Sequence, residues 1–225
     1  MFLIDFILHI DAHIASLVTQ FGPWTYLILF AIIFIETGVV IMPFLPGDSL
    51  LFAAGAVAAT PAGLAAGLNH WVFMILFFVA ALAGDTLNFW IGRTGGYKLV
   101  QHPFIGRFIK AQHIREAEGF FEKRGAMAII FGRYMPIIRT FVPFVAGISQ
   151  FPFSTFFKNA VIAAFSWSLI ATGAGYMFGN IPFVKAHFSI IIIGIAFVTI
   201  LPSIIGIVRS AMINRRAKKI EANEK

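Results

Sequence analysis

Long stretches without a charged residue constrain the fold of this chain more than any other feature. They cover residues 12–35, 49–84, 159–184 and 186–208. Each reaches the ~20 residues that an α-helix needs to cross the hydrocarbon core of a bilayer. The chain is 59% hydrophobic, whereas soluble domains are about half apolar at most. Because strand-like alternation is missing and the backbone must satisfy its own polar groups in lipid, the sequence predicts an all-α polytopic membrane protein.

The basic residues are clustered, and their positions indicate the topology. Of the 17 Lys and Arg residues, seven lie between Arg93 and Arg124 and six between Arg209 and Lys225. Clusters beside membrane spans follow the positive-inside rule and attract anionic lipid head groups. We therefore expect a cytoplasmic loop at 93–124 and a basic cytoplasmic tail at 209–225, and no nucleic-acid partner.

Counting crossings between these two clusters predicts a re-entrant segment. The number of crossings must be even, and two full spans are expected at 155–178 and 187–208. The remaining stretch, 126–150, cannot cross once without breaking this parity, and it is too short to cross twice at ~20 residues per crossing. We expect it to form a re-entrant helical hairpin. In the first half, a span at 71–92 follows a second hairpin at 24–58 that enters from the opposite side.

Proline and glycine residues are expected to form the hairpin turns, because they break helices. They are Pro46 and Gly47 in the first hairpin, and Pro136, Pro143 and Gly147 in the second. Irregular backbone at membrane depth is tolerated only where protein or a water-filled cavity satisfies it. Both hairpins are therefore expected to face the protein interior.

The two halves of the chain resemble one another. An Ala-Gly pair closes each hairpin, at Gly55 and Gly147, and the following spans end in the similar patterns Phe89–Arg93 and Tyr176–Asn180. Broken segments at corresponding positions are typical of the inverted repeats of secondary transporters, whose substrate sites lie near the membrane midplane. We expect a pseudo-inverted repeat.

The termini complete the expected organisation. Residues 1–20 have apolar residues at helical spacing and predict an interfacial amphipathic helix, followed by a membrane domain at 21–208. His9, Asp11 and His13 of this segment have metal-ligand spacing, but we interpret them as part of the interfacial helix and expect no metal site.

Four charged residues inside apolar segments are the candidate functional residues: Glu36, Asp48, Arg133 and Arg139. Each costs at least ~2.5 kcal/mol by membrane-insertion scales and needs a compensating partner. An arginine fork matches phosphate oxygens, and a carboxyl group in a low-dielectric site can exchange protons. We assign Arg133 and Arg139 to binding a phosphate head group, and Glu36 and Asp48 to proton coupling. The alternative is a purely structural ion-pair network.

Asp85 and Arg93 are accessory candidates. Asp85 lies two helical turns from Arg93 and either reaches the same site or pairs with Arg93 or another basic residue. The hairpins contain no histidine, the chain has no cysteine, and no nucleophile-elbow or phosphate-loop motif occurs. We expect no enzyme and no cofactor.

Several motifs, in order along the chain, resemble the DedA family, also described as SNARE-associated or VTT-domain membrane proteins. They are FIETG with Glu36, FLPGDS with Asp48, GDTLNFWIGR with Asp85 and Arg93, and FGRYMPIIRTFVPFVAG with Arg133 and Arg139. The resemblance covers about residues 20–208. It implies a bacterial inner-membrane protein that is needed for envelope integrity and for processes dependent on the proton-motive force.

The resemblance also implies a function. Family members are associated with flipping undecaprenyl phosphate from the outer to the inner leaflet, and eukaryotic relatives look like lipid scramblases. We expect a proton-linked translocase of undecaprenyl phosphate or a related anionic phospholipid, with lipid, protons and the membrane as partners and a homo-oligomer left open. The alternatives are a proton-coupled exporter of a small soluble ion or drug, and a structural scaffold.

Overall fold

The computed structural model of the chain describes residues 24–38, 47–101, 124–135 and 138–187, with further single residues at 16, 20–22, 119, 121, 190, 191, 194 and 195. Within these ranges every regular element is an α-helix, which confirms the all-helical prediction. Several predictions lie wholly or mostly outside the described residues: the N-terminal helix 1–20, most of the loop 93–124, the span 187–208, the tail 209–225, Pro46 and Pro136.

Two long helices, α6 (His70–Gln101) and α10 (Phe153–Phe178), dominate the structure. Among the described residues, they are the two helices long and apolar enough to cross a membrane, over His70–Gly96 and Phe153–Phe178. These ranges contain the predicted spans 71–92 and 155–178. Helix α6 continues past Arg93 to Gln101, so the first residues of the predicted cytoplasmic loop 93–124 are helical. Arg93 marks where charge begins, but a helix satisfies its own backbone in water as well as in lipid.

Four short helices accompany the long ones: α3 (Trp24–Gly38), α4 (Gly47–Ala58), α8 (Met127–Arg133) and α9 (Ile138–Ile148). The longest of them, α3, has 15 residues and is therefore about 22 Å long. A hydrocarbon core is about 30 Å thick, so each is shorter than a crossing needs. They form two pairs, one within each predicted hairpin.

Two single-turn elements lie beyond these pairs. Helix α5 (Pro61–Ala65) begins with proline, and the Thr60 hydroxyl caps it by accepting a hydrogen bond from Gly63 N at 3.0 Å. Proline at the first helical position costs no hydrogen bond, because that N–H has no partner inside a helix. Helix α11 (Pro182–Ala186) begins in the same way after α10.

Three of the predicted turn residues are instead helical. Pro143 and Gly147 lie inside α9, and Gly47 is the first residue of α4; α8 ends at Arg133, and Tyr134 is its C-cap. Pro143 has no N–H to donate to the Arg139 carbonyl four residues earlier. One residue further on, the Thr140 carbonyl accepts a hydrogen bond from Asn88 Nδ2 of α6 at 2.9 Å, which ties this turn of α9 to α6.

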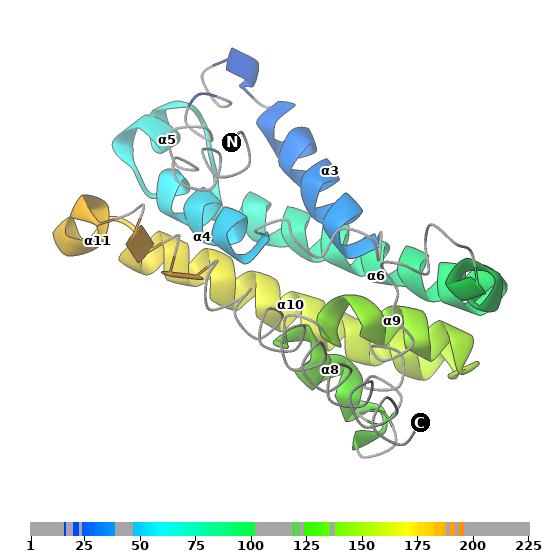
Figure 1. Ribbon diagram of the computed structural model, residues 1–225. Coiled ribbons are helices and arrows are strands. Elements are labelled where there is room, and N and C mark those ends of the chain that lie inside the picture. Colours follow the sequence, from blue (N-terminus) through cyan, green and yellow to red (C-terminus); the bar gives the residue numbers. More distant parts are fainter. Residues whose placement is uncertain are drawn as a thin grey trace, which may run out of the picture.

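The helices pack so that the two halves of the chain interleave. Helices α6 and α10 lie against each other (Figure 1). The first short helix of each half packs on its own long helix, α3 on α6 and α8 on α10. The second packs on the long helix of the other half, α4 on α10 and α9 on α6. The fold therefore contains two units, which we call unit A (α3, α6 and α9) and unit B (α4, α8 and α10).

Glycines bring the backbones together at the same places in both units. A Cβ at Gly147 of α9 would lie 2.1 Å from Phe89 O of α6, and one at Gly55 of α4 would lie 2.1 Å from Thr172 O of α10. Facing them, Gly92 and Gly175 approach the carbonyl oxygens of Phe144 and Phe52. These contacts are far too short for any side chain, so the helices approach at backbone distance.

The matched contacts correct the alignment of the two halves. Gly147 corresponds to Gly55, as the sequence indicates, but Gly92 corresponds to Gly175 rather than to Gly179. Gly179 corresponds instead to Gly96, and both lie against the residue that follows the α4 or α9 glycine, Ala56 and Ile148. Residues one helical turn apart share a face, so a sequence pattern does not decide between them.

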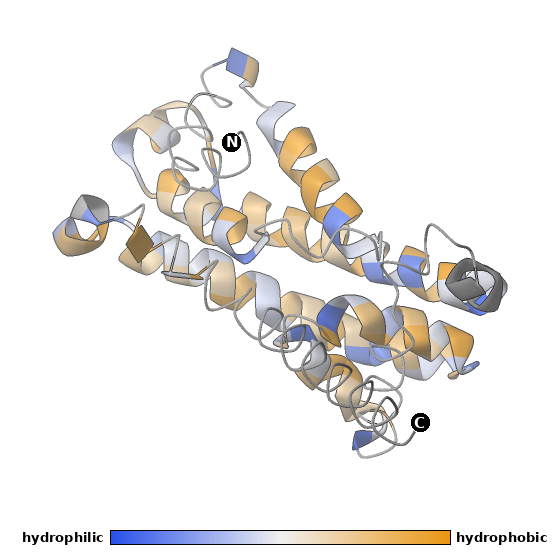
Figure 2. Ribbon diagram, viewed as in Figure 1, coloured by the Kyte–Doolittle hydropathy of each residue, from blue (hydrophilic) through white to orange (hydrophobic). Residues whose placement is uncertain are grey.

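The surface of the bundle is apolar and its interior holds charges. Large side chains stand exposed along both long helices, including Trp71 and Ile75 of α6 and Ile170 and Met177 of α10. Figure 2 shows apolar residues over most of the ribbon, with hydrophilic positions where α3 and α9 approach α6. So many large apolar side chains exposed on the described helices suit contact with lipid.

We predict that Gly175→Ala destabilises the bundle while Gly173→Ala does not. A Cβ at Gly175 would lie 1.9 Å from Phe52 O, whereas nothing lies within 4 Å of a Cβ at Gly173. Overpacking costs typically 1–3 kcal/mol, and alanine is the better helix former at an open position. Thermal unfolding of the two purified variants and of the wild-type protein in detergent measures both effects on stability. Equal melting temperatures for the two variants would contradict the packing of α4 on α10.

Candidate functional site

Arg139 forms the first of two charged clusters. It lies in the first turn of α9, and it meets Glu36 near the end of α3 and Asp48 in the first turn of α4. Its Nη1 donates to both carboxylate oxygens of Asp48, at 3.1 and 3.0 Å, and its Nη2 donates to Glu36 Oε1. The Glu36 side chain is 1% exposed and that of Arg139 12%. One guanidinium thus binds two carboxylates from two other helices.

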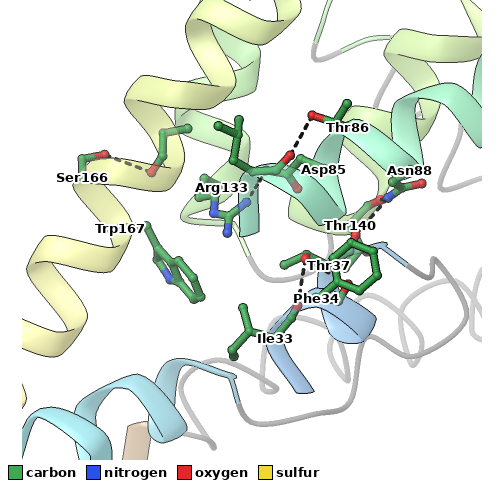
Figure 3. A network of polar contacts seen from close by, with 12 residues as sticks. Ile33, Phe34, Thr37, Asp85, Thr86, Asn88, Arg133, Thr140, Ser166 and Trp167 are labelled. Carbon is green, nitrogen blue, oxygen red and sulfur yellow. Dashed lines mark hydrogen bonds and ion pairs between the residues drawn. The ribbon is translucent and has the colours of Figure 1, made fainter. Parts of the chain in front are cut away.

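Arg133 forms the second cluster. It is the last residue of α8, where the helix dipole favours a positive charge. Its Nη1 donates to Asp85 Oδ2 of α6, and both side chains are almost fully buried. Figure 3 shows the guanidinium directed at the Asp85 carboxylate. An isolated charge at this depth would be costly, and the pair compensates both partners.

Trp167 of α10 lies between the clusters and contacts both. Its indole Nε1 donates to Asp48 Oδ1 at 2.7 Å. The Arg133 guanidinium carbon lies 4.5 Å from the centre of its ring, at cation–π distance (Figure 3). Trp167 therefore connects a carboxylate of the first cluster with the guanidinium of the second.

Close backbone approach positions the carboxylates. A Cβ at Gly47 would lie 2.1 Å from Glu36 Oε2, so the glycine leaves room for that carboxylate beside Asp48. A Cβ at Gly84 would lie 1.9 Å from Thr37 Oγ1, so the end of α3 rests directly on α6 next to Asp85. The Thr37 hydroxyl donates to Ile33 O of its own helix at 2.8 Å.

A small cavity separates the charged groups. It has a volume of about 10 Å³ and is lined by Glu36, Thr37, Asp85, Arg133, Arg139, Thr140 and Trp167. This is room for about one water molecule, and it is too small for a phosphate group.

The structure brings most of the sequence-predicted site residues together. Glu36 and Asp48 contact Arg139, while Arg133 contacts Asp85 rather than either of them. Asp85 thus reaches the same cavity and pairs with a basic residue there.

Arg93 lies apart from this cavity. Its Nη1 donates to Phe151 O at 3.3 Å, and its guanidinium lies 5.7 Å from the ring centres of Phe89 and Trp90. Arg93 and Asp85 are therefore not partners. Contacts with aromatic rings and a backbone carbonyl are those of an anchor at the end of a span.

Sequence reasoning missed Trp167 and the two threonines that line the cavity, Thr37 and Thr140. A tryptophan between two serines in an apolar run carried one usable signal, since its N–H needs a partner when buried. The threonines carried none, because threonine hydroxyls commonly bond to their own helix. Across the described residues, no group of three or more His, Asp or Glu residues is arranged to hold a metal ion.

The arrangement suits reversible anion binding. Each guanidinium has donors matched to carboxylate or phosphate oxygens. An incoming phosphate can replace the carboxylates at Arg139, provided that the displaced carboxylates are stabilised in another way. The site can thus exchange one anionic partner for another.

Comparison with known proteins decides the family. A family model of the VTT domain matches residues 45–177. The chain is 46% identical over 218 residues to Protein DedA of Escherichia coli strain K12, covering 97% of this chain and 98% of that protein. The chain belongs to the DedA family.

Other members of the DedA family are similar over most of the chain. The inner membrane protein YghB of E. coli strain K12 is 34% identical over 190 residues, which cover 81% of this chain and 78% of that protein. An uncharacterized membrane protein of Mycobacterium tuberculosis strain H37Rv is 38% identical over 186 residues, covering 83% and 80%. No solved structure matches. The chain is thus an all-helical membrane protein of the DedA family.

We predict that a second substitution, at Asp85, restores the stability lost on removing Arg133 but not the stability lost on removing Arg139. Arg133→Gln leaves Asp85 buried without its guanidinium and should cost about 3–5 kcal/mol of stability. Adding Asp85→Asn removes the uncompensated charge and should recover most of that loss. Unfolding free energies of the single and double variants measure this coupling.

The matched control is Arg139→Gln with the same Asp85→Asn. Since Asp85 is not hydrogen-bonded to Arg139 among the described contacts, the second substitution should recover much less there. Equal rescue in both backgrounds would contradict the pairing.

Proposed function

We propose that this DedA-family protein is a membrane lipid transporter that moves undecaprenyl phosphate, or a related anionic phospholipid, between leaflets. The observation that supports this proposal most is that the Arg139 guanidinium binds two carboxylates, of Glu36 and Asp48, inside an apolar helix bundle. The proposed setting is the bacterial inner membrane, in a multi-pass topology with the C-terminus in the cytoplasm.

Arg139 and Arg133 bind the phosphate in this proposal. An arginine fork recognises phosphate and carboxylate in the same bidentate geometry. Asp48 binds Nη1 of Arg139 with both of its oxygens and Glu36 binds Nη2, so the two carboxylates together occupy the fork that a phosphate would bind. The carboxylates therefore act as internal substitutes for the substrate, and they keep the arginines compensated in the closed state.

Charge balance links this exchange to protons. The clusters contain three carboxyl groups, from Glu36, Asp48 and Asp85, and two guanidiniums. A phosphate that enters adds negative charge where isolated ions are costly. Uptake of protons by Glu36 and Asp48 offsets it, so the anion and the protons travel together. This is the proposed link to the proton-motive force.

The short helix pairs provide the path. We place α3 with α4 and α8 with α9 in the bilayer as two re-entrant hairpins that enter from opposite sides, which gives the pseudo-inverted repeat. Each helix is shorter than a crossing, and the matched glycine contacts relate the two halves. The phosphate head passes between the hairpins, while the chain of the lipid stays against the apolar outer surface.

We predict that reconstituted protein moves undecaprenyl phosphate between leaflets when a proton gradient is imposed. Arg139→Lys retains the charge but loses the fork, and it should slow the initial rate about tenfold to a hundredfold, the worth of a hydrogen bond to a charged group. The measurement is a leaflet-resolved assay in proteoliposomes. Lys158→Gln, at an exposed position of α10, is the control and should retain the wild-type rate.

Wild-type protein that leaves undecaprenyl phosphate and other anionic phospholipids in their original leaflet would exclude the proposal. If proton flux were instead driven by a soluble ion or drug, and were lost in Glu36→Gln, the protein would be a proton-coupled exporter. If the protein showed neither lipid transport nor proton-coupled export, and variants with the charges of a pair exchanged still folded, the result would indicate a structural scaffold.

We predict that positions 123 and 158 lie on the same side of the membrane. Because the chain has no cysteine, Lys123→Cys and Lys158→Cys each introduce a single thiol. An impermeant maleimide added to cells should react with both thiols only after the membrane is opened. Labelling of one position before opening and of the other only after it would show that 126–150 crosses the membrane, and the hairpin assignment would fail.

A further inference from the structure

Trp167 differs from the other tryptophans in its environment. Trp24, Trp71 and Trp90 are 68%, 60% and 44% exposed on the outer surface, where tryptophan suits the membrane interface. Trp167 is 6% exposed and makes the two polar contacts described above. Its indole is therefore not an interfacial anchor.

The internal repeat shows that Trp167 is not required for helix packing as such. Gly92 corresponds to Gly175, and eight residues before each lie Gly84 and Trp167. At Gly84 the end of α3 rests directly on α6. In the other half a large side chain stands at the equivalent place, and it contacts charged groups.

The charged contacts divide according to the two packed units. Two ion pairs join unit A to unit B: Arg139 of α9 with Asp48 of α4, and Asp85 of α6 with Arg133 of α8. Within unit A, Glu36 of α3 holds Arg139 of α9. A substrate that enters between the units must break the two joining pairs, and each unit must then stabilise the charges it keeps.

Within unit B, Trp167 makes the corresponding contacts. Its N–H binds Asp48 and its ring lies against Arg133, and all three residues belong to helices of unit B. Helix α4 and helix α10 approach at backbone distance through Gly55 and Gly175. The hydrogen bond from Trp167 to Asp48 therefore joins two closely packed helices of unit B and does not involve α9.

We propose that Trp167 is a positioning residue that holds Asp48 and Arg133 in place while unit A and unit B move apart and Arg139 turns from Asp48 to the phosphate. This inference rests on the proposed function, because it describes how the same site opens. The indole lowers the cost of opening in two ways: it stabilises the released carboxylate, and it keeps the Arg133 guanidinium directed at the cavity.

The first test needs no ligand. Arg139→Gln imitates the state in which Asp48 has lost the guanidinium, and Trp167→Phe removes the N–H but keeps a ring. At pH 8, Trp167→Phe should lower the melting temperature about twice as much, or more, in the Arg139→Gln protein as in wild type, since the indole then carries a larger share of the carboxylate. An equal or smaller decrease would overturn the proposal. Trp24→Phe is the matched control and should show no such dependence.

The second test measures binding of farnesyl phosphate to the full-length protein in detergent, with farnesol as the uncharged control. Trp167→Phe should weaken binding about tenfold to a hundredfold, and it should have little effect when Asp48→Asn is also present. A structural role alone would weaken binding equally in both backgrounds, and that result would overturn the proposal.

The two tests keep the inferences distinguishable. If wild-type protein bound farnesyl phosphate no better than farnesol and moved no lipid phosphate, the proposed function would fail, and the melting-temperature comparison would still decide the role of Trp167. If binding and transport were present but Trp167→Phe behaved like Trp24→Phe in both tests, the role of Trp167 would fail and the proposed function would stand.

Discussion

The structure depends on compensation of charge inside an apolar helix bundle. Ions at this depth are costly, and a protein that retains them must pair them. Arg139 binds Glu36 and Asp48, and Arg133 binds Asp85 and lies against Trp167. These contacts come from six different helices, so the charges also determine how the helices meet. Removing one partner leaves an uncompensated charge, whereas exchanging it for another anion does not.

Because the two halves of the chain interleave, two of these ion pairs join unit A to unit B. Since α4 packs on α10 and α9 on α6, each long helix holds one short helix from the other half. Glycines bring α9 to α6 and α4 to α10 at backbone distance, while α8 packs on both α10 and α9. The ion pairs of Asp48 with Arg139 and of Asp85 with Arg133 join the two units, which also contact through α6 and α10. Contacts of this kind change when groups of packed helices move against one another.

The small cavity shows how closely the charged groups are packed. It has room for about one water molecule, and Asp48 and Glu36 already occupy Nη1 and Nη2 of Arg139. Under the proposed function, a phosphate head group competes with these carboxylates, and protons balance its charge. Membership of the DedA family, shown by similarity to DedA and YghB of E. coli, agrees with a membrane setting for this chemistry.

The sequence by itself determined the helical class, the two long spans, the short helices beside them and the four interior charges, because uncharged length and the cost of buried charge are local properties. It did not determine which charges pair. Pairing Arg133 with Asp85 depends on α8 packing against α10 beside α6, and no spacing along the chain encodes that distance.

Only the structure places Pro143 and Gly147 inside α9, where Gly147 lets the helix approach Phe89 of α6 at backbone distance. The alignment of Gly92 with Gly175 required the packed backbones, since residues one turn apart share a helix face. Trp167 became visible as a link between clusters only when α10 was placed between α4 and α8. Local periodicity specifies which segments are helices, but contacts between distant segments specify which atoms meet.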